Sequence, residues 1–165
     1  MILKSDDFNN NEPLDKKFTC DGEDFSPHLR WSNPPEGTKS FALTFSRVDP
    51  EQGEINHWNV YNIPAELNEI EQDGVIPGIQ VRNDFYTLNY EGPNATGGVQ
   101  KYIFRIYALD VEKLEGLNDK NFRRIINVHT IERAQLIAFY ERKTKPKPLA
   151  SCSGSCSGNP LDFEQ

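Results

Sequence analysis

The stretch KYIFRIYAL, residues 101–109, decides the fold class of this chain. In an extended segment Tyr102, Phe104 and Ile106 share one face, and Ile103 and Tyr107 share the other. Because both faces are largely apolar, we expect a strand that lies centrally between two packed layers. This stretch predicts a mostly β protein whose other strands come from distant parts of the chain.

Two other segments have the alternation of half-buried strands, residues 39–49 and 55–62. In the second, simple alternation places Trp58 on the face opposite His57. Residues 28–31 are a weaker strand candidate. Turn-forming Gly, Pro and Asn residues separate these runs at 33–37, 49–53, 77–78 and 92–93, which favours an antiparallel layout with long loops.

Helices are expected only late in the chain. Asn118 or Asp119 is predicted to cap a short helix that runs to Ile126. Thr130 is predicted to cap a second helix over residues 131–142, with an apolar stripe at helical spacing. We expect one domain over residues 1–142, followed by a low-complexity tail over residues 143–165.

Composition narrows the functional class. The chain has 165 residues, a net charge of -7 and a pI of about 5.0, so nothing predicts a nucleic-acid partner. The sequence has no apolar leader and no run long enough to span a membrane, which favours the cytoplasm. Three cysteines do not suggest a disulfide framework. Cys152 and Cys156 are expected to be reduced thiols in the tail, with pairing or metal binding as the alternative.

No motif predicts a cofactor, a metal centre or catalysis. The sequence lacks a Gly-rich phosphate loop, HExxH, paired CxxC and GxSxG. Asp49 and His57 nevertheless flank a turn, so a hairpin would bring them together. A carboxylate beside an imidazole raises its pKa, and such a pair can hold an anion or act as a base. A buried core histidine is the alternative.

A second group of candidates follows the Gly92-Pro93 turn. Glycine lets the backbone approach a ligand closely and leaves its N–H as a donor. Gln100 and Tyr102 follow on the central strand, where the phenol can donate a hydrogen bond. An ordinary turn that leads into a strand is the alternative.

Several motifs in a fixed order resemble the phosphatidylethanolamine-binding protein family, in its bacterial Raf-kinase-inhibitor-like branch. They are CDGEDFSPHLRW (20–31), PPEGTKSFAL (34–43), NHWNVYNIP (56–64), YEGP (90–93), QKYIFRIYALD (100–110) and VHTIERAQLIAFYER (128–142). The resemblance implies two packed antiparallel sheets in a Greek-key arrangement, with short helices near the C-terminus. It also implies a small cavity that binds phosphate-like anions, including phospholipid head groups.

Carried across, the family's pocket aspartate, histidine, glycine and tyrosine fall on Asp49, His57, Gly92 and Tyr102. Two positions depart from the family pattern. Arg47 stands where the family usually has another aspartate, and Gln100 stands where it usually has a second pocket histidine. A glutamine cannot become cationic, so the pocket loses a charge-assisted bond unless Arg47 replaces it. Strand alternation also allows Arg47 to point away.

Three functions remain in order of preference. The first is a non-catalytic binding protein in which Asp49 orients His57, and His57, Gly92, Pro93, Gln100 and Tyr102 line an anion pocket. The second is a protein-interaction module that regulates a kinase or another signalling partner. The third is a hydrolase with His57 as its base. The resemblance alone suggests a homodimer.

Overall fold

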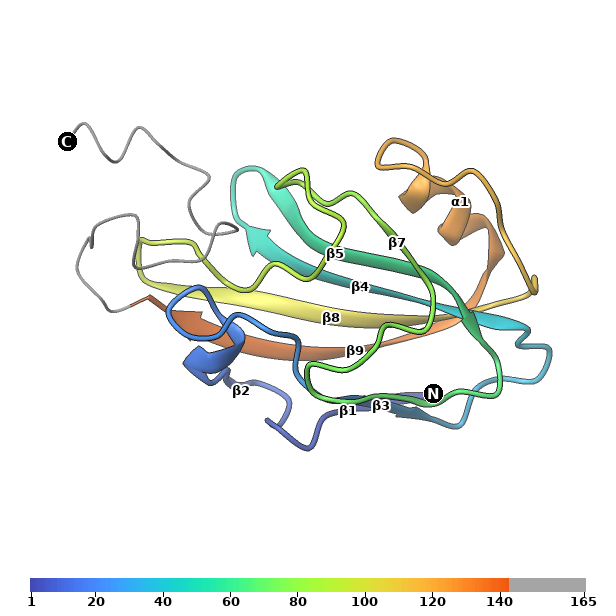
Figure 1. Cartoon of the computed structure of the whole chain (residues 1–165), viewed down its shortest axis with the longest axis horizontal. Helices are drawn as coiled ribbons and strands as arrows, with labels where there is room; N and C mark the ends of the chain where they lie inside the picture. Colours follow the sequence, from blue (N-terminus) through green and yellow to red (C-terminus); the bar gives the residue numbers. More distant parts are fainter. Residues whose placement is uncertain (143–165) are drawn as a thin grey trace.

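The computed structural model describes residues 1–142, so the predicted tail and its two cysteines lie outside the described residues. It consists of two packed sheets, which confirms the predicted mostly β class (Figure 1). The larger sheet has the order β2(Glu12–Pro13), β9(Thr130–Glu141), β8(Val99–Leu109), β4(Ser40–Asp49), β5(Gly53–Pro64), β7(Ile79–Val81). The smaller sheet has the order β1(Ile2–Lys4), β3(Leu29–Ser32), β6(Glu69–Ile70).

The strand β8 is central, as its two apolar faces predict. It pairs with β4 on one side and with β9 on the other, antiparallel to both. Phe104 and Ile106 are fully buried in the main core between the sheets, whereas Tyr107 and Leu109 belong to a second apolar cluster. All strand pairs are antiparallel except β2 with β9, which is parallel.

The predicted second helix is wrong, because residues 130–141 form the strand β9. This strand pairs with β8 from Leu109 to Val99, and the pairing satisfies its backbone along its length. Every second side chain, from Ala134 through Leu136 and Ala138 to Tyr140, packs on the main core. The helical stripe seen in the sequence was a coincidence of apolar residues on both sides of this strand.

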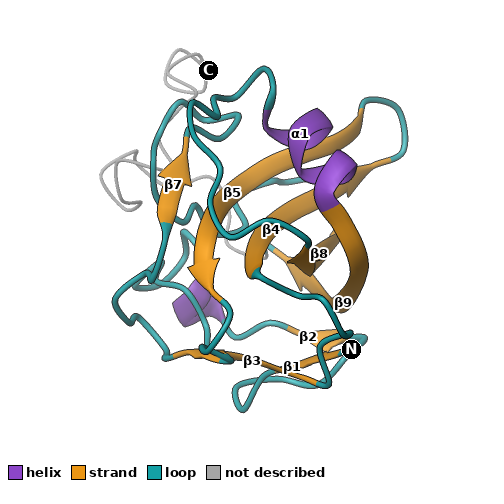
Figure 2. Cartoon of the chain, turned by 90° about the vertical axis from the view of Figure 1, so that its right-hand side faces the viewer, coloured by secondary structure: helices purple, strands orange, loops and turns teal. Residues whose placement is uncertain are grey.

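The first predicted helix exists and is shifted toward the C-terminus, as α1(Phe122–His129). The Asn118 side chain accepts hydrogen bonds from the backbone N–H groups of residues 120 and 121 ahead of it. Phe122 and Ile126 pack against the second cluster. Figure 2 shows α1 on one side of the larger sheet and β1 and β3 on the other. No helix in residues 1–142 is long and apolar enough to cross a bilayer.

Candidate functional site

A β-bulge in β5 sets the direction of the His57 side chain. Phe45 pairs with Trp58 and Ser46 pairs with Asn56, so His57 is the extra residue between two registered pairs. The His57 ring stands 5.5 Å from the Phe45 ring and 5.6 Å from the Tyr102 ring. Simple alternation had placed His57 and Trp58 on opposite faces. The bulge instead buries both in the aromatic interior.

The hydrogen bonds of His57 identify its tautomer. Its Nδ1 lies 2.7 Å from the backbone carbonyl oxygen of Glu91, which can only accept, so Nδ1 carries a proton. In a neutral ring Nε2 is then an acceptor. That atom is buried and has no hydrogen-bond partner. The His57 backbone is also held, because its carbonyl accepts from the Glu91 N–H at 3.2 Å and from the Asn83 amide at 3.1 Å.

Burial keeps His57 neutral. Its pKa falls from 6.5 to about 4, mainly through desolvation and with a smaller contribution from the charge of Arg47, although hydrogen bonding to the Glu91 and Gly92 backbone acts in the opposite direction. The Phe85 ring, 4.7 Å away, helps Phe45 and Tyr102 to exclude water from the imidazole. At neutral pH the site therefore holds an uncharged histidine, not the imidazolium that the sequence reasoning expected to hold an anion.

Asp49 does not orient His57. No hydrogen bond or ion pair joins the two within residues 1–142. The Asp49 carboxylate accepts the N–H groups of Gln52 and Glu51 at 2.8 Å each, and these bonds, with Arg47, hold its pKa below the usual value. The expected hairpin forms, but the carboxylate bends back to close its own turn.

Arg47 faces the site. It lies opposite Tyr102 in the pairing of β4 with β8. Its guanidinium bridges the Asp49 carboxylate and the Gln100 side-chain oxygen, at 3.2 Å each. Its charge contributes to lowering the pKa values of His57 and Tyr102, which agrees with this placement. Arg47 therefore does not point away from the site. Gln100 is uncharged, and its side-chain oxygen helps to hold the Arg47 guanidinium in place.

Tyr102 is the second buried polar group without a partner. Its side chain is fully buried, and its hydroxyl has no hydrogen-bond partner within ordinary distance and angle limits; the Ala95 backbone makes a polar contact with it that falls outside those limits. Burial raises its pKa far above the usual value, so the phenol stays protonated and can donate. His57 Nε2 and the Tyr102 hydroxyl are thus one acceptor and one donor on neighbouring rings.

The Gly92-Pro93 turn follows Glu91 and is itself held by hydrogen bonds. The Gly92 N–H donates to the Asp24 carboxylate at 2.9 Å, so it is not the free donor that the sequence suggested. A Cβ at Gly92 would lie 2.3 Å from that oxygen and 2.3 Å from the carbonyl oxygen of Phe18, so only glycine fits. Pro93 is buried, and its carbonyl accepts from the Cys20 N–H at 3.2 Å.

Two residues that matter here were missed by sequence reasoning. Glu91 orients His57 through its backbone carbonyl, and Asp24 holds Gly92. Both lie inside quoted motifs, YEGP and CDGEDFSP. Neither role was visible, because a backbone carbonyl has no residue-type signature and the bond from Asp24 spans 68 positions.

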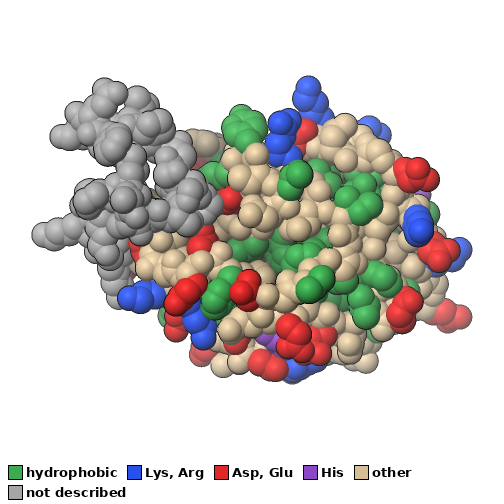
Figure 3. Space-filling model, viewed as in Figure 1, with side chains coloured by type: hydrophobic (Ala, Val, Ile, Leu, Met, Phe, Trp, Pro, Cys, Tyr) green, Lys and Arg blue, Asp and Glu red, His purple; other side chains and the backbone are tan. Residues whose placement is uncertain are grey.

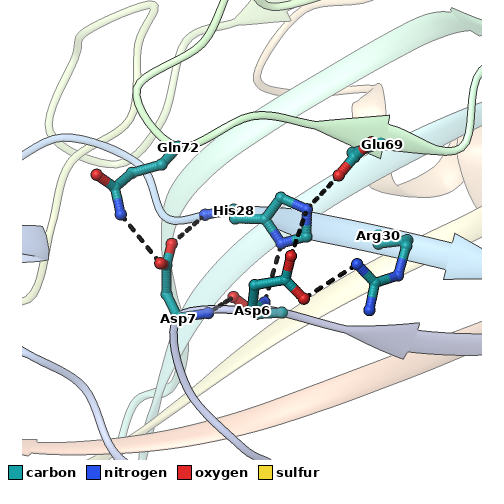
Figure 4. A network of polar contacts seen from close by, with 7 residues as sticks. Asp6, Asp7, His28, Arg30, Glu69 and Gln72 are labelled. Carbon is teal, nitrogen blue, oxygen red and sulfur yellow. Dashed lines mark hydrogen bonds and ion pairs between the residues drawn. The ribbon is translucent and has the colours of Figure 1, made fainter.

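His28 belongs to a separate network on the small sheet, with Asp6 and Glu69 (Figure 4). The ligand atoms of these three residues lie within 4.8 Å of one another, which is close enough to consider a metal. However, His28 Nδ1 accepts the Asp6 N–H at 2.9 Å, so Nε2 must carry the proton that it shares with Glu69. A protonated nitrogen is no metal ligand. Acidic side chains gather on this edge, over β1 and β3 (Figure 3).

Comparisons with known proteins show the family to which the chain belongs. The family model described as Phosphatidylethanolamine-binding protein matches residues 4–141. A UPF0098 protein of Aquifex aeolicus is 37% identical over 155 residues, which covers 86% of this chain and 89% of the relative. The UPF0098 protein YbhB of Escherichia coli is 31% identical over 160 residues, with 85% and 99% covered.

Solved structures agree. The crystal structure of a phosphatidylethanolamine-binding protein homologue of Chlamydia trachomatis superposes with a TM-score of 0.79 at 30% identity, over 86% of this chain and 97% of that one. Escherichia coli YbcL, described as a new member of the mammalian family, superposes with a TM-score of 0.78 at 31% identity, over 86% and 98%.

Proposed function

The chain belongs to the phosphatidylethanolamine-binding protein family, and from that premise we propose that it is a non-catalytic binding protein for a phosphate-like group. The group enters between His57, Tyr102 and Arg47. A phospholipid head group and a phosphorylated side chain present the same chemistry to these residues.

One observation carries the proposal: two neighbouring polar atoms are buried without a partner. Leaving a buried donor or acceptor unsatisfied costs about 1–3 kcal/mol each. His57 Nε2 and the Tyr102 hydroxyl both have this status, on rings 5.6 Å apart. A bound oxyanion relieves both costs, and Arg47 supplies the positive charge that Gln100 lacks.

The histidine tautomer specifies the form of the ligand. Because Nε2 is an acceptor, it binds an oxygen that still carries a proton. A phosphate monoester has a second pKa of about 6, so its monoanion offers one P–OH group for Nε2 and other oxygens for Tyr102 and Arg47. We expect binding to be coupled to the uptake of about one proton at neutral pH, by the ligand or by His57.

The low basicity of His57 supports a non-catalytic role. A general base works best when its pKa lies near the working pH, and a pKa of about 4 is far below neutral. The imidazole is therefore a poor proton acceptor for a hydrolase at pH 7, although it remains a good hydrogen-bond acceptor.

Calorimetry with phosphoethanolamine, in buffers of different ionisation enthalpy, tests both parts. We expect saturable binding that weakens as the pH rises from about 5.5 to about 8, with proton uptake that appears as a buffer-dependent heat. His57→Gln abolishes the uptake, whereas the control His129→Gln, at a partly exposed histidine, leaves it unchanged. A phosphoserine peptide as second ligand separates a lipid-like from a protein-like preference. Absence of heat together with unchanged NMR spectra refutes the proposal, and pH-independent binding refutes the assigned tautomer.

A further inference from the structure

A second polar cavity lies on the other face of the larger sheet. Thr44 and Ser46 of β4 line this cavity of about 300 Å³, which also borders α1. Phe45 and Arg47 point to the opposite face, toward Tyr102, because strand neighbours alternate. Its volume is at the lower end of the range for small-ligand sites. The cavity shares no lining residue with the site of the proposed function.

Arginine is concentrated in this cavity. Four of the eight arginines of the chain line it, and no lysine within residues 1–142 does. The chain as a whole has a net charge of -7, so this surface departs from the average composition. A guanidinium offers two parallel N–H groups to a carboxylate or phosphate, which a lysine cannot do.

Three of these arginines surround a single carboxylate. Arg105 donates two hydrogen bonds of 2.8 Å to the two oxygens of Glu54, and Arg123 lies 3.7 Å from the same group. The hydrogen bond from Arg105 is the main cause of the lowered Glu54 pKa, and the charges of Arg123 and Arg133 lower it further. Three guanidinium groups therefore act on one carboxylate.

The other two carboxylates of the cavity have partners elsewhere. Asp119 accepts two hydrogen bonds from Arg82, at 2.9 and 3.2 Å. Asp84 accepts the backbone N–H of Asn56 at 2.7 Å. Neither carboxylate bonds to the arginines around Glu54. Four arginines and three carboxylates line the cavity, so its lining has a net charge of +1.

Hydrogen-bond donors in the cavity are also in excess. The Nε atom of Arg105 is buried without a partner. No ion pair of Arg133 and no hydrogen bond from the Ser46 hydroxyl is found within residues 1–142, although Ser46 is only 2% exposed. An oxyanion is the ligand that meets both excesses. We infer that this cavity is a second anion site, for a small solute that carries a phosphate or carboxylate group.

The test is an NMR titration of the full chain with inorganic phosphate and, separately, with succinate. We expect saturable shifts of the backbone amides of Ser46, Glu54 and Arg105, and comparing the two titrations tells a phosphate from a carboxylate site. The double variant Arg123→Gln with Arg133→Gln should weaken binding about tenfold or more, because charge-assisted bonds are lost. Both side chains are on the surface, so the fold should be retained. The matched control is Arg124→Gln, next to Arg123 on α1 and outside the cavity.

Each outcome separates this site from the proposed function. Cavity shifts that persist in His57→Gln support the second site independently. Shifts confined to the surroundings of His57 and Tyr102 overturn it and leave the proposed function intact. Equal weakening by Arg124→Gln also overturns it, because the effect is then a general attraction to the helix. No shift with either anion overturns it directly.

Discussion

Acidification should destabilise this protein through one buried histidine. His57 has a pKa of 6.5 when unfolded and about 4 when folded, because burial disfavours its charged form. Between these values the unfolded chain binds more protons than the folded one. Stability from the neutral His57 is therefore complete above about pH 6.5 and falls as the pH decreases toward about 4.

The size of this effect follows from the two pKa values. At about 1.4 kcal/mol per pKa unit, the gap corresponds to about 3 kcal/mol of unfolding free energy. The free energy of unfolding of a folded domain is typically about 5–15 kcal/mol. The loss from His57 is therefore a large part of the total stability. The loss should be resolved without difficulty from the contribution of the carboxylates, most of which titrate at lower pH.

The assay is urea unfolding at a series of pH values, for the natural chain and for His57→Gln. A glutamine amide can still donate to the Glu91 carbonyl and does not titrate, so the variant should lose the pH dependence between about 6.5 and 4. His129→Gln, a change at a less buried histidine, is the control and should keep that dependence. Parallel pH profiles for the natural chain and His57→Gln would refute the assignment of a buried, neutral imidazole.

Three further changes test the site. Tyr102→Phe removes an unpartnered hydroxyl, so urea unfolding should show unchanged stability or a gain of up to about 1–2 kcal/mol. Calorimetry on the same variant should show about tenfold weaker phosphate binding. A clear loss of stability would mean that the hydroxyl has a partner. Gly92→Ala places a methyl group against the Asp24 carboxylate and a backbone oxygen and should cost about 1–3 kcal/mol, and a neutral effect would contradict the close approach. Asp49→Ala should lower the melting temperature, because the hydrogen bonds from the Glu51 and Gln52 N–H groups are lost. His57 should be neutral at pH 7 by NMR both in the natural chain and in that variant. A ring that is charged in the natural chain and becomes neutral in the variant would restore the pairing that spacing suggested.

If the proposed pocket binds an anion, a neutral histidine changes how it does so. A pocket built on an imidazolium attracts anions by charge, whereas this one combines an acceptor, a phenol donor and the guanidinium of Arg47. Selectivity then depends on the protonation state of the ligand. A fully ionised sulfate-like anion offers no proton to His57 Nε2 and should bind less well than a phosphate monoanion.

Local patterns were sufficient for most of the fold. The three main predicted strands are found with their ends displaced by a few residues at most. They could be predicted because the burial of side chains alternates from one residue to the next along a strand. Residues 130–141 were misassigned because apolar residues occur on both sides of that strand. Pairing with β8 decided between helix and strand, and that pairing joins segments far apart in the chain.

The amino-acid sequence by itself determined which groups this protein has available: a histidine and a tyrosine in aromatic strands, an arginine and a glutamine in place of acidic and basic pocket residues, and a glycine at the turn. Only the tertiary structure decided what they do. A bulge of one residue turns His57 inward, a carbonyl 34 positions away selects its tautomer, and Asp49 closes a turn in place of contacting the ring. The reason is physical: protonation state and hydrogen-bond direction depend on partners and burial that exist only when distant segments pack together.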